Sequence, residues 1–476
     1  MPLIALCVAL SATGAARAGA PGETAGGVPA SPAAPMAGPN GADPCADGTL
    51  SVPLTLLDAV SHTLCANPKT RSAWATIKLN AAALAIAKEN YYPTLSGTAK
   101  AVHSATSTHL NQLSALDTYA ASSYPEETLS FSWVLYDFGE RGAELDSARQ
   151  LLAAARADLD LSLQQVFLQA TADYYGAQAA QASLDSAREI ETLANSSVGA
   201  AHARVDKGVA PISDELQAQT AYAQAVVNRV KVEAELSVKR GALASDMGLD
   251  PDTAISVPPA AEEVHSQSTF TESLHELIEQ AKRTHPSVAV AAGQLAAAEA
   301  DERAARAHVL PSFSLLGGFS RSNEPLTPNL GSPSVPGNVS NWSVGVEVDV
   351  PLSDALWKRG IIARAHAQVQ VQQEALYGAQ QQIAEDVWDS YTAVQAGTAN
   401  LSNSQALLES ARRSLESAQR RYEGGAGTIL ELLSAQSAYA NASQQRIQAL
   451  SDWRVARLAL GASLGRLTLS DAQEGR

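Results

Sequence analysis

The sequence predicts a mostly helical chain that also contributes strands to a β-barrel and is built from two similar halves. Three observations lead to this fold class. The chain of 476 residues repeats itself after about 217 positions. Long stretches rich in Ala, Leu, Ser and Gln contain little proline, which suits closely packed helices. Each half also contains two short segments in which apolar and polar residues alternate, as they do in strands with one apolar and one wet face.

The internal repeat is visible at several separated points. A shift of 217 places "KGVAPISDELQAQTAYAQA" on "GGAGTILELLSAQSAYANA", so that Gly208 meets Gly425. A shift of 218 places "YYPTLS" on "VLPSFS", and the dipeptide Arg141–Gly142 on Arg359–Gly360. The register holds along nearly the whole chain. Each half is therefore expected to contain two helices, a strand pair, a long helix, a turn and another long helix.

The amino terminus has the features of an export signal. A short apolar run, "LIALCVAL", precedes the small-x-small pattern of Ala16, Arg17 and Ala18, although no Lys or Arg comes before the run. Cys7 is followed by a bulky Val, so the alternative of a lipoprotein lacks a good motif. The next segment is rich in Gly, Pro and Ala, and we expect a flexible arm there. The predicted segments are a signal peptide (1–18), the arm (19–48), a first repeat (49–250), a linker (251–270), a second repeat (271–467) and a tail (468–476).

Two cysteines remain once the signal is removed, Cys45 and Cys65. An even pair in an exported protein favours a disulfide, because the compartment is oxidising. Two separate buried thiols are the alternative. A bond between the two cysteines would tie the arm to the first helix of the repeat.

The four predicted strands come in two pairs. In "LSFSWVLYD" the alternation puts Leu129, Phe131, Trp133 and Leu135 on one face. In "WSVGVEVDV" it sets Trp342 and four valines, Val346 among them, against Ser343, Gly345, Glu347 and Asp349. A soluble sheet with one wet face is the alternative, but a water-filled barrel in lipid requires this division of apolar and polar faces. The predicted strands lie near 94–102, 128–136, 312–320 and 341–350, with polar loops over 103–127 and 321–340.

The predicted helices are very long. No proline occurs between Gly139 and Arg204, a stretch of about 60 residues, which spans roughly 90 Å as a helix. The last helix has an apolar seam with steps of three and four, and a second stripe gives it partners on two sides. The seam comprises Leu432, Ala435, Tyr439, Ala442, Arg446, Ala449, Trp453, Ala456, Leu460, Ser463 and Leu467.

Several classes of function are disfavoured. The net charge is −16 without a basic tract, so nucleic acid is an unsuitable partner. The nine histidines form no HExxH or other cluster of metal-ligand spacing, and the sequence lacks GxSxG, GxxxxGK[ST] and CxxC. We therefore expect no catalytic residue, no cofactor and no metal. No later segment is a continuous apolar run of about 20 residues, the length of a transmembrane helix.

The duplicated halves, their strand pairs and the "G…AQ…Y" turns resemble the TolC family of outer-membrane exit ducts, over about residues 50–467. The opening "DPC…LCANP" with the following "RSAW" resembles the type I secretion subgroup. The resemblance implies a homotrimer in the outer membrane, in which each chain gives four strands to a shared 12-stranded barrel and its helices to a periplasmic tunnel. It also implies an inner-membrane ABC transporter and a membrane-fusion adaptor as partners.

The resemblance further implies a gate at the tips of the two helix hairpins, which are marked by Gly208, Gly424, Gly425 and Gly427. Its residues would be Tyr422 and Glu431 in the second tip, with Ser213 and Asp214 in the first. Gly427 occupies the position of a family Arg, so a salt bridge from there to Asp214 is in doubt, and closure is expected to rest on hydrogen bonds involving Tyr422. The alternative for Glu431 is a solvated residue that stabilises the start of its own helix.

Three functions fit these observations. The first is the outer-membrane channel of a type I secretion system, which passes an exported protein such as a large toxin to the outside. The second is the same duct in a multidrug or metal efflux pump. The third, a soluble periplasmic coiled-coil adaptor, would not require four alternating strands in each chain.

Overall fold

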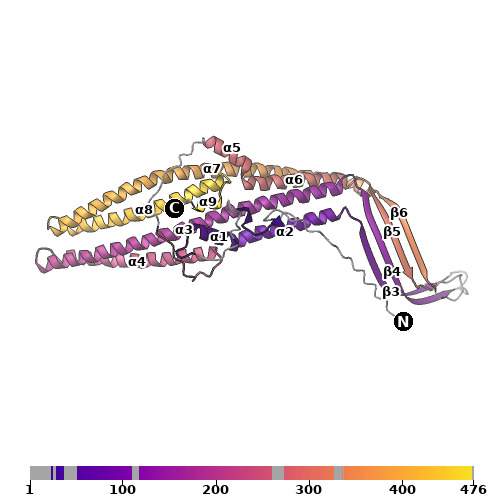
Figure 1. Cartoon of the computed structure of the whole chain (residues 1–476), viewed down its shortest axis with the longest axis horizontal. Helices are drawn as coiled ribbons and strands as arrows, with labels where there is room; N and C mark the ends of the chain where they lie inside the picture. Colours follow the sequence, from indigo (N-terminus) through magenta and orange to yellow (C-terminus); the bar gives the residue numbers. More distant parts are fainter. Residues whose placement is uncertain are drawn as a thin grey trace. The chain divides into compact units, whose positions relative to one another are not determined.

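The computed structural model describes residues 23–24, 28–36, 45, 51–109, 117–259, 273–325, 335 and 337–473. The chain forms two compact units. One comprises Met1–Lys78, Ala155–Val290 and Tyr377–Arg476, and the other comprises Leu79–Ala154 and Ala291–Leu376. The first unit contains the tips of the helix hairpins, and the second contains the β-sheet together with the first parts of the two long helices that follow it (Figure 1). The predicted signal peptide lies outside the described residues.

The two halves have the same order of elements, as the repeat predicts. In the first half two helices, α1 (Leu56–Ala66) and α2 (Pro68–Glu89), come before the strands β3 and β4 in the chain. Two long helices, α3 (Glu140–Asp206) and α4 (Ile212–Asp246), follow these strands. In the second half α5 (Leu274–Thr284) and α6 (Pro286–Ala307) come before the strands β5 and β6, and α7 (Leu352–Glu423) and α8 (Ile429–Ser463) follow them. The short elements β1 (Glu23–Thr24), β2 (Val28–Pro29), η1 (Ala34–Met36) and α9 (Leu469–Gln473) lie outside this duplicated order.

Local sequence signals set the starts of several helices. The Thr55 side chain accepts the amide hydrogen of Asp58 at the start of α1. Ser273 with Glu276 forms a capping box at α5. Each of these contacts satisfies an amide that has no partner within its helix. Pro68 and Pro286 are the first residues of α2 and α6, where a missing N–H costs nothing.

The last long helix has neighbours on two sides, as its two stripes predict. Leu401 of α7 packs with Leu450 and Trp453 of α8. On the other side Ser443 of α8 lies 2.8 Å from Ser186 of α3, measured between the hydroxyl oxygens. In Figure 1 the hairpins α3–α4 and α7–α8 lie side by side with their turns at the same end. The helix α8 therefore contacts both its hairpin partner α7 and the helix α3 of the other hairpin.

The four longer strands form one antiparallel sheet in the order β3-β4-β5-β6. They are β3 (Thr94–Thr108), β4 (Thr118–Tyr136), β5 (Ser312–Ser322) and β6 (Val339–Asp349). The two strand pairs of the sequence join through β4 and β5, so that both halves of the repeat contribute to one sheet. β3 and β6 are its edges.

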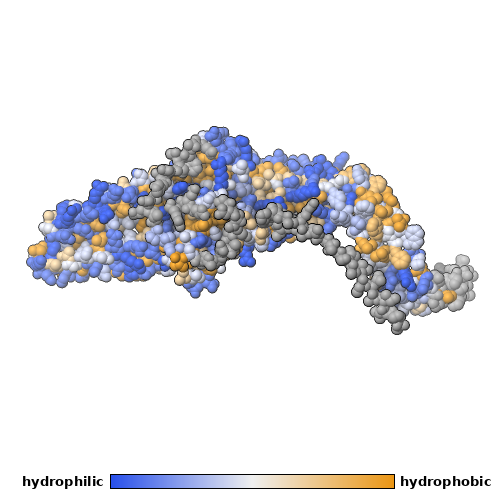
Figure 2. All heavy atoms as spheres, viewed as in Figure 1, coloured by the Kyte–Doolittle hydropathy of each residue, from blue (hydrophilic) through white to orange (hydrophobic). Residues whose placement is uncertain are grey.

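The register divides the sheet into an apolar and a polar face. Leu129 pairs with Phe319, which pairs in turn with Trp342, and residues in such cross-strand rows share a face. Ser130, Gly318 and Ser343 form a row on the opposite face. In the space-filling view hydrophobic residues gather over the strands (Figure 2). The described apolar face comprises Leu95, Leu129, Phe131, Trp133, Phe313, Leu315, Phe319, Trp342, Val344, Val346 and Val348.

A bulge interrupts the alternation of β4 at Leu135, the last residue of its predicted apolar face. The register shifts between Val134 and Tyr136, so that Tyr136 rather than Leu135 stands opposite Phe313. A β-bulge adds one residue to one strand and moves every later side chain to the other face. The sequence pattern of the single strand does not reveal such an insertion.

The first predicted loop is also wrong over much of its length. β3 continues to Thr108 and β4 begins at Thr118, within the region 103–127 that we expected to be a loop. The polar side chains there form cross-strand pairs, with His103 Nδ1 2.8 Å from Ser123 Oγ. A strand wet on both faces has no hydrophobic alternation, which explains why the sequence pattern missed it.

The ends of the chain are more ordered than expected where they are described. Within the predicted flexible arm, Ala33 is fully buried and the carbonyl of Pro29 accepts the indole hydrogen of Trp74 at 2.9 Å. The predicted tail contains α9, which packs against α1 and buries Leu469. The described parts of both segments therefore pack against the repeat.

Candidate functional site at the two hairpin tips

The turns of the two hairpins have the same backbone conformation. Gly208 and Gly425 have φ angles of +70° and +79°, in the left-handed region that favours glycine. The amide of Val209 donates to the carbonyl of Arg204 at 3.0 Å, and that of Ala426 donates to the carbonyl of Arg421 at 2.9 Å. Because these pairs are related by the shift of 217, the repeat extends to individual hydrogen bonds.

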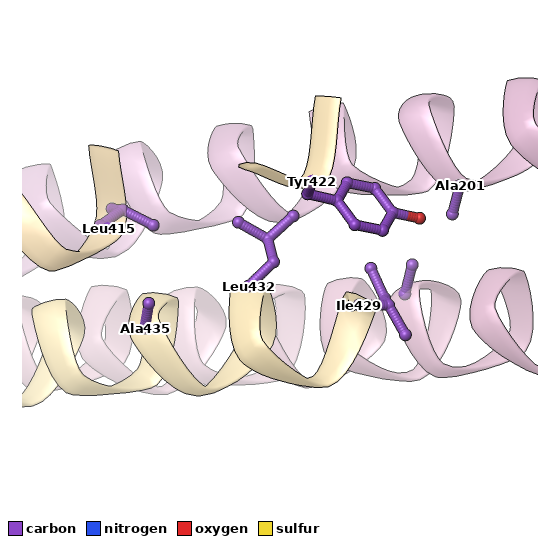
Figure 3. Close-up of a cluster of buried hydrophobic side chains, with 7 residues drawn as sticks. Ala201, Leu415, Tyr422, Ile429, Leu432 and Ala435 are labelled. Atoms are coloured by element: carbon purple, nitrogen blue, oxygen red, sulfur yellow. The ribbon is translucent and has the colours of Figure 1, made fainter. Parts of the chain in front are cut away.

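Buried apolar side chains from both hairpins form one cluster between the tips. Tyr422, only 1% exposed, is its largest member. Its ring points toward Ala201 of α3 and lies beside Ile429 of α8 (Figure 3). The cluster comprises Ala201, Ala218, Leu415, Tyr422, Ile429, Leu432 and Ala435. The two tips of one chain are therefore packed against each other.

Tyr422 is held to the first tip through its backbone and its ring. Arg204 Nη1 donates to the Tyr422 carbonyl oxygen at 2.6 Å, and its guanidinium carbon lies 4.7 Å from the ring centroid. Within the described part of the chain the buried phenol oxygen has no hydrogen-bond partner. Burial raises the pKa of Tyr422, an effect that nearby Asp214 increases and Arg204 opposes. The contact to the first tip thus involves the Tyr422 carbonyl and not its hydroxyl.

The structure places Glu431 at the start of its own helix. Its carboxylate and Thr428 form a capping box at the amino terminus of α8. Glu431 Oε2 also lies 3.4 Å from Arg421 Nη2, and the Glu431 side chain is 48% exposed. The carboxylate therefore has the helix-stabilising contacts that the alternative interpretation requires.

Ser213 and Asp214 lie in the first turn of α4, which has no side-chain cap at Pro211. Ser213 is exposed and Asp214 is half-buried. Of the predicted gate residues, Asp214 and Tyr422 lie close enough for the carboxylate to influence the phenol. Next in the same turn, Glu215 lies 3.1 Å from Nδ1 of His202 in α3, a contact within the first hairpin.

Two glycines of the second tip have little room for a side chain. A Cβ added at Gly427 would lie 3.0 Å from the backbone nitrogen of Tyr422, and one added at Gly424 would lie 3.2 Å from the carbonyl oxygen of Arg420. Any side chain at Gly427 would thus require the turn to shift slightly, so the backbone of this tip favours glycine at that position.

Arg204 and Gln436 are tip residues that sequence reasoning did not single out. Gln436 Nε2 donates to Ser197 Oγ at 2.8 Å and is buried between α8 and α3. The repeat offered a signal for Arg204, since it aligns with Arg421. Which partner each arginine selects depends on contacts between the hairpins, which no local pattern contains.

Cys45 and Cys65 form a disulfide, with their Cα atoms 5.6 Å apart. The bond connects the arm to α1. Among the described residues no group of His, Cys, Asp and Glu side chains is arranged to hold a metal ion. None of the described helices is long and apolar enough to cross a membrane.

The profile of the family described as outer membrane efflux protein matches residues 59–249 and 277–466, one match for each half. The chain therefore belongs to this family, the TolC-type outer-membrane channels. It is an outer-membrane channel protein whose helices extend into the periplasm, and it is not an enzyme.

Individual relatives agree with this assignment. The chain is 31% identical to Protein CyaE of Bordetella pertussis over 415 residues, which are 87% of this chain and 84% of the relative. It is 24% identical to Nodulation protein T of Rhizobium leguminosarum bv. trifolii over 73% of each chain. Its fold matches that of the outer-membrane channel OprN with a TM-score of 0.75 and 21% identity, over 90% of this chain and 95% of OprN.

Proposed function

We propose that this chain is the outer-membrane duct of a type I secretion system. It passes an exported protein, such as a large toxin, from an inner-membrane ABC transporter to the outside, and a membrane-fusion adaptor bridges the two. Two observations favour this branch of the family: the amino-terminal motifs of the type I secretion subgroup, and the 31% identity to CyaE over most of both chains.

The β-sheet is the structural observation that best supports a channel through the membrane. Its apolar face is open in the single chain, where Trp342 is 78% exposed and Val344 is 70% exposed. Its edge strands β3 and β6 also have one unpaired side each. Lipid does not tolerate unpaired strand edges, so the sheet has to close. Four strands from each of three chains give a barrel of 12, with the apolar face toward lipid and Glu347 and Asp349 toward the water-filled interior.

The hairpin tips form the periplasmic mouth of this duct. The proposed gate comprises Tyr422 and Glu431 of the second tip and Ser213 and Asp214 of the first. Three copies of Glu431 around the axis would make an acidic ring, which attracts cations as such rings do in cation pores. The proposed repeat boundaries, 49–250 and 271–467 with a linker at 251–270, contain both family matches.

An efflux duct for drugs or metal ions is the second candidate, because the family is described as efflux proteins. A deletion strain separates the two. Type I secretion predicts that an exported large protein accumulates inside the cell, with drug and metal sensitivity unchanged. The opposite pattern would establish efflux.

The trimer has its own test. The purified protein should run on gels at about three times the monomer mass before heating and as a monomer afterwards, because the barrel closes on assembly. A monodisperse monomer in mild detergent would contradict the shared barrel.

A further inference from the structure

Arg204 and Arg421 occupy equivalent positions in the two hairpins. Each lies in the last turn of a long helix, and the carbonyl of each accepts an amide hydrogen from the turn that follows. The acidic residues that follow are equivalent as well, since the same shift of 217 places Asp214 on Glu431. Simple duplication would therefore give both arginines the same contact, with the acid of their own hairpin.

The two arginines nevertheless have different partners. Arg421 stays within its own tip, 3.4 Å from Glu431 Oε2 and 3.4 Å from the carbonyl oxygen of Ala426. Arg204 instead crosses to the other hairpin, where it donates to the Tyr422 carbonyl at 2.6 Å and lies over the Tyr422 ring. Position 205, the counterpart of Tyr422, is Val, so the first tip offers Arg421 no ring in return.

The Tyr422 carbonyl has a second role that makes this contact effective. It also accepts the amide hydrogen of Gly425 at 3.1 Å, within the left-handed turn of the second tip. Arg204 thus binds the backbone that shapes that turn, and covers the ring at the centre of the apolar cluster. A hydrogen bond from a charged group is about twice as strong as one between neutral groups.

We propose that Arg204 is the positioning residue that latches the second tip to the first within each protomer, and that this contact has to break before the mouth of the duct opens. The proposal rests on the proposed function, which places the gate at the tips. In this proposal the Arg204 guanidinium keeps the two tips of a protomer together by binding the carbonyl and the ring of Tyr422. The phenol hydroxyl of Tyr422 does not take part in closure.

Single-channel recording of the purified trimer in planar bilayers tests the latch. Arg204→Ala should raise the ratio of open to closed states about tenfold, as the loss of a charged hydrogen bond predicts. Arg421→Ala is the matched control, because it removes an arginine from the equivalent position but loses only exposed contacts within its own tip, to Glu431 and to the Ala426 carbonyl. It should behave like the wild type. Arg204→Lys should be intermediate, because lysine keeps the charge without the planar fork.

Tyr422→Phe separates the two modes of closure. The phenol oxygen has no hydrogen-bond partner in the described part of the chain, so removing it should leave the open-to-closed ratio unchanged. The latch is overturned if Arg204→Ala equals the wild type, if Arg421→Ala opens the channel equally, or if Tyr422→Phe opens it as much as Arg204→Ala.

Hydrogen exchange on the full-length protein in detergent gives a readout independent of conductance. Arg204→Ala changes the first tip, but it should speed amide exchange in residues 429–436 of the second tip at least threefold. The reason is that the variant is expected to raise the fraction of separated tips about tenfold. Arg421→Ala should leave exchange in residues 212–219 of the first tip unchanged. If the wild type forms no channel, the proposed function fails. If exchange in the second tip does not respond to Arg204→Ala, the latch fails.

Discussion

Asn67 and His285 stand at equivalent positions of the two halves, and each caps the helix that follows it. Asn67 Oδ1 accepts the amide hydrogen of Lys69 at 2.9 Å, at the start of α2. His285 Nδ1 accepts the amide hydrogen of Ser287 at 3.2 Å, at the start of α6. A histidine nitrogen can accept this hydrogen only while it is unprotonated. One repeat therefore uses a cap that is independent of pH, and the other uses a cap that is lost on protonation.

The His285 cap predicts a pH-dependent stability. Burial lowers the pKa of His285 below its ordinary value of 6.5, although a hydrogen bond to the backbone of Ala462 and the charge of Asp386 oppose this shift. Because the unfolded chain binds the proton more readily, stability should fall as the pH drops through 6.5. His285→Asn copies the cap of the other repeat and should remove this pH dependence, because asparagine does not titrate. Melting temperatures between neutral and mildly acidic pH measure it. The exposed His275→Asn serves as control, and an unchanged pH dependence in His285→Asn would contradict the prediction.

Loss of the disulfide should destabilise the end of the repeat where the arm attaches. The bond between Cys45 and Cys65 closes a loop of 20 residues, which in the entropic treatment contributes about 3 kcal/mol. Cys65→Ser should therefore lower the melting temperature of the oxidised protein, and Cys45→Ser should do so equally. Mass spectrometry of the unreduced wild type should recover both cysteines in one linked peptide pair, and two free thiols would refute the bond.

The two faces of the sheet should respond oppositely to charge. Val346 lies on the apolar face opposite Leu315 and is 65% exposed, whereas its neighbour Glu347 lies on the polar face. Val346→Arg places a charge in lipid at a cost of about 2–4 kcal/mol near the bilayer centre, and should reduce the heat-labile trimer in outer-membrane fractions. Glu347→Ser should assemble normally. Equal assembly of both variants would show that the apolar face does not meet lipid.

Glu431 should set cation selectivity if three copies surround the duct axis. Glu431→Gln keeps the capping box, because glutamine also serves at that position, but removes the charge. It should weaken cation selectivity and block by multivalent cations in planar bilayers without destabilising the tip. Glu409→Ala, which removes an exposed carboxylate of α7, is the control. If both variants conduct alike, Glu431 acts only as a helix cap.

Much of the architecture was predictable because its signals are local or repeat in register. The shift of 217 to 218 residues revealed the duplicated order of helices and strands, and a second apolar stripe beside the seam predicted two neighbours for α8. Such patterns persist because each half has to bury the same faces. For the candidate site, the left-handed glycines Gly208 and Gly425 were visible in the sequence, since few other residues adopt that conformation.

The tertiary structure alone decided the contacts that depend on distant segments. The strands extend into a predicted loop, where His103 and Ser123 pair across the sheet, and the register of β4 shifts at Leu135. In the described part of the amino-terminal arm, Ala33 is buried and Pro29 accepts a hydrogen bond from Trp74, 45 residues further along the chain. Arg204 and Arg421 are identical in type and in register, yet they have different partners, and Val205 stands in the first tip where Tyr422 stands in the second. The sequence therefore determined the helices and strands and their repetition. Packing between the hairpins determined that Arg204, and not the equivalent Arg421, contacts the other tip.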